Sequence, residues 1–319
     1  MFGFLKRLLP QRKPAPRAPR RAQKSEIHRR IRRLEIKTLR LVHNIFGGEY
    51  QSVFKGRGIE FDEVREYQEG DDPRLIDWNV TARMDRLFVK KFVEERELSI
   101  MLVVDVSASE DFGSVGPMKR ELAAELAAAI TMSALHNHDQ VGACLFSDRV
   151  ERFVKPKKGR GHVNRLVREV LTCQPAGRGT DYAVVERFLM GLLKQRSVVF
   201  FVSDFLSPGF ERPLRLLATR HDVIPVLIAD PRERSLPDVG LVRLEDPETG
   251  ESVVIDTHSA EVRKQYARRT AEAHQARIDA FRRLGLDHLE LRTDEGYVKP
   301  LIRFFQARQS RRGKKKGKV

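Results

Sequence analysis

Ile100-Met101-Leu102-Val103-Val104 is a run of five apolar residues that leads directly into Asp105-Val106-Ser107-Ala108-Ser109. A short apolar run bounded by polar residues is typical of a strand that is buried on both faces of a sheet. Four similar runs follow: Val141 to Phe146, Val198 to Val202, Val223 to Ile228 and His288 to Leu291. Helical faces lie between or after them, such as Val163, Leu166, Val167, Val170 and Leu171, and Val298, Leu301, Ile302 and Phe305. Alternating strands and helices predict an α/β fold, with a doubly wound and mostly parallel sheet.

Oxygen-bearing side chains stand at the ends of two predicted strands and at the start of one predicted helix. Asp105, Ser107 and Ser109 come after the first strand, Thr180 opens a helix, and Asp204 comes after the run that ends at Val202. In a doubly wound sheet such loops gather at the carboxyl ends of the strands, and hydroxyls and carboxylates are the ligands that Mg²⁺ prefers. An Asp-x-Ser-x-Ser stretch alone is more typical of a helix cap, but its occurrence together with Thr180 and Asp204 favours a metal site.

This set of residues resembles the metal-ion-dependent adhesion site of von Willebrand factor type A (vWA) domains. The resemblance implies that Ser107 and Ser109 bind the metal directly, and that Thr180 binds it directly or through water. It implies that Asp105 and Asp204 act mostly through water. It implies that one coordination position of the metal stays open and takes an Asp or Glu of a protein partner. The ion would be Mg²⁺, or Mn²⁺ or Ca²⁺.

A second resemblance covers roughly residues 48 to 306. It is carried by Gly58 to Asp62, Tyr67, Gly70-Asp71-Asp72, Ile76-Asp77-Trp78, Ala82-Arg83, Gly159-Arg160-Gly161 and Leu291 to Asp294. These motifs are similar to the signature of the bacterial domain-of-unknown-function-58 family, whose vWA-like members are associated with MoxR-type AAA+ ATPases. The resemblance implies a non-catalytic interaction module that works with such an ATPase in the assembly or maturation of other proteins.

The sequence departs from these families in two respects. Ser109 is followed by Glu110 and Asp111, where vWA sites usually have Met. An extra carboxylate at the rim of the site would either tighten metal binding or repel an acidic partner. Many members also have N-terminal membrane spans, whereas no run here approaches the ~20 apolar residues of a span. We therefore expect a cytoplasmic protein whose membrane contacts, if any, are peripheral.

The excess positive charge predicts how the chain is divided. Of the formal charge of +16, eight Lys or Arg lie in residues 1–24 and seven in residues 307–319, with no acidic residue in either segment. We expect both segments to be disordered. Between them, the patterns predict an amphipathic helix (25–47), a small β-rich unit (48–97) and the vWA-like domain (98–306), with an inserted β-hairpin near 241–255.

Two other functions remain open from the residues. A metal-dependent phosphohydrolase of the haloacid-dehalogenase type also places an Asp after the first strand of a doubly wound sheet, but it needs a second Asp two residues later, where this chain has Ser107. The general acid for the leaving group is then missing, which favours a protein that is not an enzyme. The basic tails could instead tether the chain to a membrane or, without sequence specificity, to nucleic acid, and either contact would weaken as salt is added.

Overall fold

The computed structural model describes residues 60–84, 86–93 and 98–316. The tail predicted at 1–24 and the amphipathic helix predicted at 25–47 lie outside the described residues. Within these ranges, no helix is both long and apolar enough to cross a membrane.

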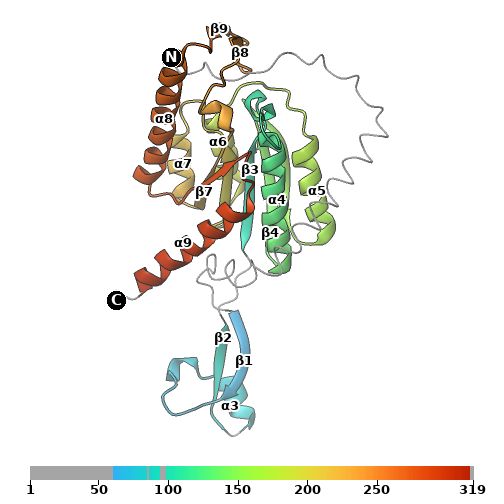
Figure 1. Ribbon diagram of the computed structural model, residues 1–319. Coiled ribbons are helices and arrows are strands. Elements are labelled where there is room, and N and C mark those ends of the chain that lie inside the picture. The colour runs from blue at the N-terminus through green and yellow to red at the C-terminus, as the bar shows by residue number, and fades with distance from the viewer. Residues whose placement is uncertain (1–59, 85, 94–97, 317–319) are drawn as a thin grey trace.

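A six-stranded sheet forms the centre of the larger unit (Figure 1). Its strand order is β10-β7-β6-β3-β4-β5, and every neighbouring pair is parallel except β4 and β5. The strands are β3 (Ser99–Asp105), β4 (Gln140–Phe146), β5 (Val150–Lys157), β6 (Val198–Ser203), β7 (Asp222–Ala229) and β10 (Leu289–Arg292). All five apolar runs of the sequence are strands, and the predicted α/β fold with a mostly parallel sheet is confirmed.

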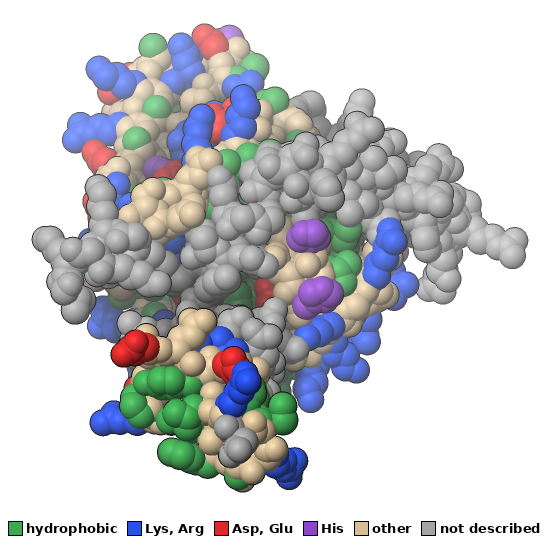
Figure 2. Space-filling view, turned by 90° about the horizontal axis from the view of Figure 1, so that it is seen from below, with side chains coloured by type: hydrophobic (Ala, Val, Ile, Leu, Met, Phe, Trp, Pro, Cys, Tyr) green, Lys and Arg blue, Asp and Glu red, His purple; other side chains and the backbone are tan. Residues whose placement is uncertain are grey.

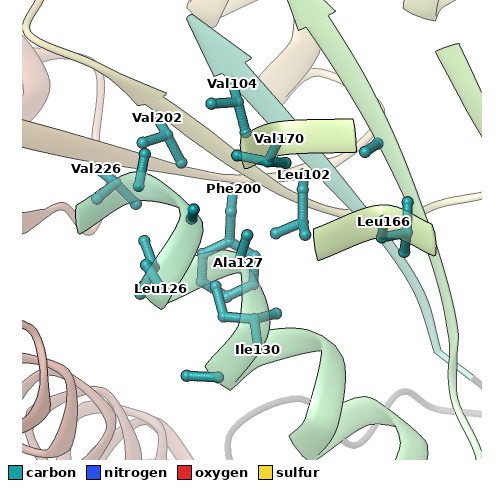
Figure 3. Packing of buried hydrophobic residues seen from close by; sticks show 14 of the residues in the cluster. Leu102, Val104, Leu126, Ala127, Ile130, Leu166, Val170, Phe200, Val202 and Val226 are labelled. Carbon is teal, nitrogen blue, oxygen red and sulfur yellow. The ribbon is translucent and has the colours of Figure 1, made fainter. Parts of the chain in front are cut away.

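Helices cover both faces of this sheet because alternate residues of each buried strand point to opposite sides. Leu102 and Val104 belong to the apolar cluster that includes α4 (Lys119–His136), α5 (Arg160–Thr172) and α9 (Val298–Lys316). Figure 3 shows part of that cluster, with Leu126 and Ile130 of α4 facing the strands. Met101 and Val103 point the other way, into a cluster with α6 (Tyr182–Leu192), α7 (Glu211–Ala218) and α8 (Ala260–Arg283).

A small unit precedes the sheet in sequence. Strand β1 (Glu60–Glu66) pairs antiparallel with β2 (Phe88–Val93), and η2 (Pro73–Leu75) and α3 (Trp78–Met84) lie between them. The Asp72 side chain caps η2 by accepting a hydrogen bond from the Arg74 backbone NH at 2.9 Å. In Figure 2 this unit faces the reader, and apolar side chains gather on it. The exposed ones include Leu75, Trp78, Met84 and Leu87.

A second two-stranded sheet lies between β7 and α8 in sequence. Strands β8 (Leu241–Glu245) and β9 (Ser252–Asp256) pair antiparallel and form a hairpin. At the base of the hairpin, the Thr257 hydroxyl donates to the Gly240 carbonyl at 2.7 Å. Its tip, residues 246–251, is a turn that bears on the candidate site.

The C-terminal helix corrects the predicted boundary at residue 307. Helix α9 continues to Lys316, so residues 307–316 are helical and not a disordered tail. Charge alone suggested a solvated end, but Arg308 is 6% exposed and forms ion pairs with Asp222 and Asp287. The apolar side chains of Phe304 and Phe305, one turn earlier, are buried as well.

Replacing Arg308 by alanine is expected to lower the free energy of unfolding by about 3 kcal/mol, because removing one partner leaves the Asp222 carboxylate without its buried cation. Urea denaturation followed by circular dichroism measures the change. The matched control is Arg311→Ala, one turn further along, where the exposed ion pair with Asp287 should contribute less than about 1 kcal/mol. Equal effects of the two substitutions would contradict an anchoring role for Arg308.

Candidate metal centre

Asp105 is fixed at the carboxyl end of β3. Its side chain is buried, and each of its two oxygens accepts one hydrogen bond. The Ser107 backbone NH donates to Oδ1 at 2.9 Å, and the Ser203 hydroxyl donates to Oδ2 at 2.8 Å. Because Ser203 is the last residue of β6, the adjacent strand, the carboxylate is held at the boundary between the two strands.

Ser107 and Ser109 lie in the turn that follows. Both side chains are fully buried, and their Oγ atoms are 3.1 Å apart. Ser107 precedes the short helix η3 (Ala108–Asp111), and its hydroxyl does not cap that helix. The helix-cap alternative to a metal site is therefore wrong for Ser107. The two hydroxyls instead face one another beside Asp105.

Asp204 and Glu110 are joined across the neighbouring loops. The Asp204 backbone NH donates to Glu110 Oε1 at 3.0 Å, and both side chains are buried. The sequence suggested that Glu110 lies at the rim of the site. That placement is wrong: Glu110 is 1% exposed, because η3 turns its side chain inward toward β6.

Asp105, Glu110 and Asp204 form one buried acidic cluster, in which one oxygen of each carboxyl lies within 4.8 Å of the others. Burial raises the pKa of Asp105 to about 6, and the charge of Asp204 adds to this shift. Burial also raises the pKa of Glu110 well above its usual value. Crowded and buried carboxyls of this kind carry their negative charge at a cost in stability, and a bound cation reduces that cost.

The residues present fit a divalent cation. Glu110 Oε2 is buried and has no hydrogen-bond partner, which is uncommon for a carboxylate oxygen and indicates a place for an ion or a water. Two seryl hydroxyls and three carboxyls supply the hard oxygen ligands that Mg²⁺, Mn²⁺ and Ca²⁺ prefer. The cluster can therefore hold a metal ion, with Ser107, Ser109, Asp105, Asp204 and Glu110 as the side chains around it.

A lysine already supplies one positive charge beside the cluster. Lys119, the first residue of α4, is fully buried, and its ammonium group donates to Asp204 Oδ2 at 2.8 Å and to Glu233 Oε1 at 2.6 Å. Glu233 lies in the short helix η4 (Pro231–Glu233) after β7. The Asp204 and Glu233 charges raise the pKa of Lys119 against the opposing effect of burial, so Lys119 is charged. The Asp204 carboxylate therefore binds Lys119 on one oxygen, while its other oxygen accepts from the Leu206 backbone NH.

Thr180 lies on the adjacent loop, before α6. A backbone hydrogen bond of 3.1 Å from Ala108 to Arg178 ties this loop to the turn that contains Ser107 and Ser109. The Thr180 hydroxyl donates at 3.1 Å to Glu248, in the tip of the β8–β9 hairpin. The Thr180 loop is thus joined to the turn of the predicted ligands, and the Thr180 hydroxyl is directed toward the hairpin.

Sequence reasoning missed three residues of this site: Lys119, Glu233 and Glu248. Lys119 had a local signal, since a lysine at the first position of a helix is unfavourable for the helix dipole. Glu233 and Glu248 lie in loops far along the chain, at positions where glutamate is ordinary. Nothing in the sequence singled them out.

The chain is similar to a protein family and to several individual proteins. The family model described as "Protein of unknown function DUF58" matches residues 63–277. The uncharacterized protein Rv1480 of Mycobacterium tuberculosis is 37% identical over 285 residues, which are 88% of this chain and 89% of the relative. The uncharacterized protein YeaD of Bacillus subtilis is 30% identical over 125 residues, 38% of this chain and 28% of the relative.

Solved structures show weaker likenesses. The alignment with the conserved hypothetical protein BatB from Bacteroides thetaiotaomicron covers 67% of this chain and 99% of the BatB chain, with 13% sequence identity and a TM-score of 0.43. The alignment with the SpRpn10 VWA domain covers 42% of this chain and 76% of the Rpn10 chain, with 14% sequence identity and a TM-score of 0.32.

Proposed function

The chain belongs to the DUF58 family, and we propose that it is a metal-dependent protein-interaction module that captures a carboxylate of a partner protein. The observation that carries the proposal is the buried cluster of Asp105, Glu110 and Asp204 beside the hydroxyls of Ser107 and Ser109. A Mg²⁺ ion held there, or Mn²⁺ or Ca²⁺, keeps part of its coordination shell for water or for a ligand from outside.

The charges of the site favour binding over catalysis. Lys119 and a divalent ion together supply three positive charges against the three carboxyls of the cluster, so a carboxylate from outside can bind the ion directly without a large net repulsion. No group stands two residues after Asp105 to protonate a leaving group, because Ser107 occupies that position. We therefore propose a partner that presents Asp or Glu, and we propose that this partner is a MoxR-type AAA+ ATPase or its client.

Adding Mg²⁺ or Mn²⁺ is expected to raise the melting temperature, since an ion that binds only the folded state contributes about 2.7 kcal/mol at 100 times its dissociation constant. The shift should shrink or vanish in Ser107→Ala. The matched control is Ser133→Ala, which removes a buried serine hydroxyl from α4. Ser133 lies about 21 Å along the helix from Lys119, the α4 residue beside the centre. Differential scanning fluorimetry with and without chelator measures all three proteins. An unchanged shift in Ser107→Ala would rule out this centre.

Capture of the partner must follow the same pattern. A MoxR-type ATPase mixed with the wild type in Mg²⁺ is expected to co-elute in size-exclusion chromatography, and chelator or Ser107→Ala should each release it. Ser133→Ala should retain it. Equal capture by all of these proteins, with and without chelator, would show that the metal is not the bridge.

A further inference from the structure

The tip of the β8–β9 hairpin is built to hold one carboxylate in place. Within the turn, Asp246 Oδ1 accepts a hydrogen bond from the Glu248 backbone NH at 2.9 Å. The Asp246 backbone NH donates to the Glu251 carbonyl at 2.8 Å, which closes the turn. Gly250 has a φ of 76°, a conformation that favours glycine. These contacts fix the backbone of Glu248 relative to the two strands.

The side chain of Glu248 contacts two loops of the candidate metal centre. Glu248 Oε1 accepts from the Thr180 hydroxyl at 3.1 Å, and its Oε2 accepts from the Ser207 hydroxyl at 3.1 Å. Thr180 precedes α6, whereas Ser207 follows Asp204 by three residues in the loop after β6. One side chain of the hairpin therefore joins the two loops that flank the acidic cluster.

Tyr182 links the Thr180 loop to the candidate metal centre. The Tyr182 side chain is buried below the Thr180 loop, and its hydroxyl lies 3.3 Å from Ser203 Oγ, which in turn donates to Asp105. The loop that Glu248 contacts through Thr180 is therefore connected to Asp105 through Tyr182 and Ser203.

The hairpin depends on such contacts for its position. A two-stranded sheet is at best marginally stable by itself, and the outer face of this one is exposed, with Leu241 at 75% and Val254 at 57%. Leu244 and Asp246 are buried on the other face. Loss of the bonds made by Glu248 is therefore expected to loosen the hairpin without unfolding the sheet beneath it.

We propose that Glu248 is an internal carboxylate that caps the metal centre and occupies the approach of a partner's carboxylate. The inference rests on the proposed function and adds its regulation. Because the hairpin is tethered, Glu248 competes at an effective concentration on the order of millimolar. A partner must then displace the hairpin, so the centre is closed in the isolated protein and opens only when a stronger acidic ligand arrives.

The test compares Glu248→Ala with Glu251→Ala in the full chain. Glu251 is an exposed glutamate three residues later in the same turn, so its replacement removes the same charge from the hairpin. In chelator, amide hydrogen exchange of residues 241–256 is expected to be on the order of tenfold faster in Glu248→Ala, as the loss of hydrogen bonds to a charged acceptor implies. With Mn²⁺, water-proton relaxivity should rise in Glu248→Ala as water gains access to the ion. Glu251→Ala should resemble the wild type in both measurements.

Each combination of results decides the inference. If Glu248→Ala and Glu251→Ala behave alike in both measurements, the inference that Glu248 caps the metal centre is wrong. Faster exchange without a change in relaxivity would show that Glu248 anchors the hairpin but does not cover the ion, which also overturns the inference. If Ser107→Ala does not alter Mn²⁺ relaxivity, the proposed metal centre fails instead, and exchange in chelator still shows whether Glu248 holds the hairpin on the two loops.

Discussion

Replacing Lys119 by methionine is expected to lower the free energy of unfolding of the metal-free protein by about 3–5 kcal/mol. The substitution keeps a long apolar side chain but removes the ammonium group that binds both Asp204 and Glu233. The buried Asp204 carboxylate would then lose the ammonium group that pairs with it next to Glu110. A divalent ion can supply part of the missing charge, so the stabilisation by Mg²⁺ should be larger in Lys119→Met than in the wild type.

Urea denaturation in chelator and in Mg²⁺ measures both effects. The matched control is Lys299→Met, which makes the same substitution at an exposed position in the first turn of α9 and should change the stability by less than about 0.5 kcal/mol. A Lys119→Met protein as stable as the wild type in chelator would contradict the pairing. An unchanged Mg²⁺ effect would show that the ion and the lysine do not act on the same carboxylates.

Asp105→Asn is expected to stabilise the metal-free protein at pH 7 by about 3 kcal/mol while it weakens the response to metal. The pKa of Asp105 is raised from 3.8 to about 6 in the folded state, chiefly by burial, so the folded protein binds its proton more tightly than the unfolded chain. Stability from this group is therefore present at low pH, is lost as the pH rises from about 4 to about 6, and stays lost above. Asparagine carries no charge and avoids the loss.

The measurement is the difference in unfolding free energy between wild type and Asp105→Asn, taken in chelator from pH 4 to pH 8. The difference should grow across the interval from about pH 4 to pH 6 and then level off. Asp279→Asn makes the same substitution at an exposed position of α8 and is the matched control. If the wild type is more stable than Asp105→Asn at pH 7 in chelator, the ionised Asp105 carboxylate does not destabilise the metal-free protein, and the prediction is wrong.

The fold could be read from the sequence because its signals are local. Each central strand is a short apolar run such as Ile100 to Val104, and both faces of the sheet are covered by helices, so every residue of the run is apolar. The end of α9 could not be placed in the same way. The charge near Arg308 resembled that of a solvated tail, and only the packing of the helix beside Asp222 shows that this arginine is buried.

The residues of the candidate site can also be separated into those that local sequence patterns predict and those that they do not. Asp105, Ser107, Ser109, Thr180 and Asp204 stand at the ends of strands or the starts of helices, and the topology of a parallel sheet brings such positions to one edge. The sequence by itself therefore determined the α/β fold and which loops meet.

The tertiary structure alone decided how the charges in those loops are arranged. Hydrogen bonds and ion pairs between segments about 85 to 115 residues apart, such as Lys119 with Asp204 and with Glu233, follow from side-chain directions that no local pattern encodes. The inward turn of Glu110 and the contact of Glu248 with Thr180 were fixed in the same way. Strand periodicity is a property of neighbouring residues, whereas the charge balance of a buried site depends on which distant groups share the space from which water is excluded.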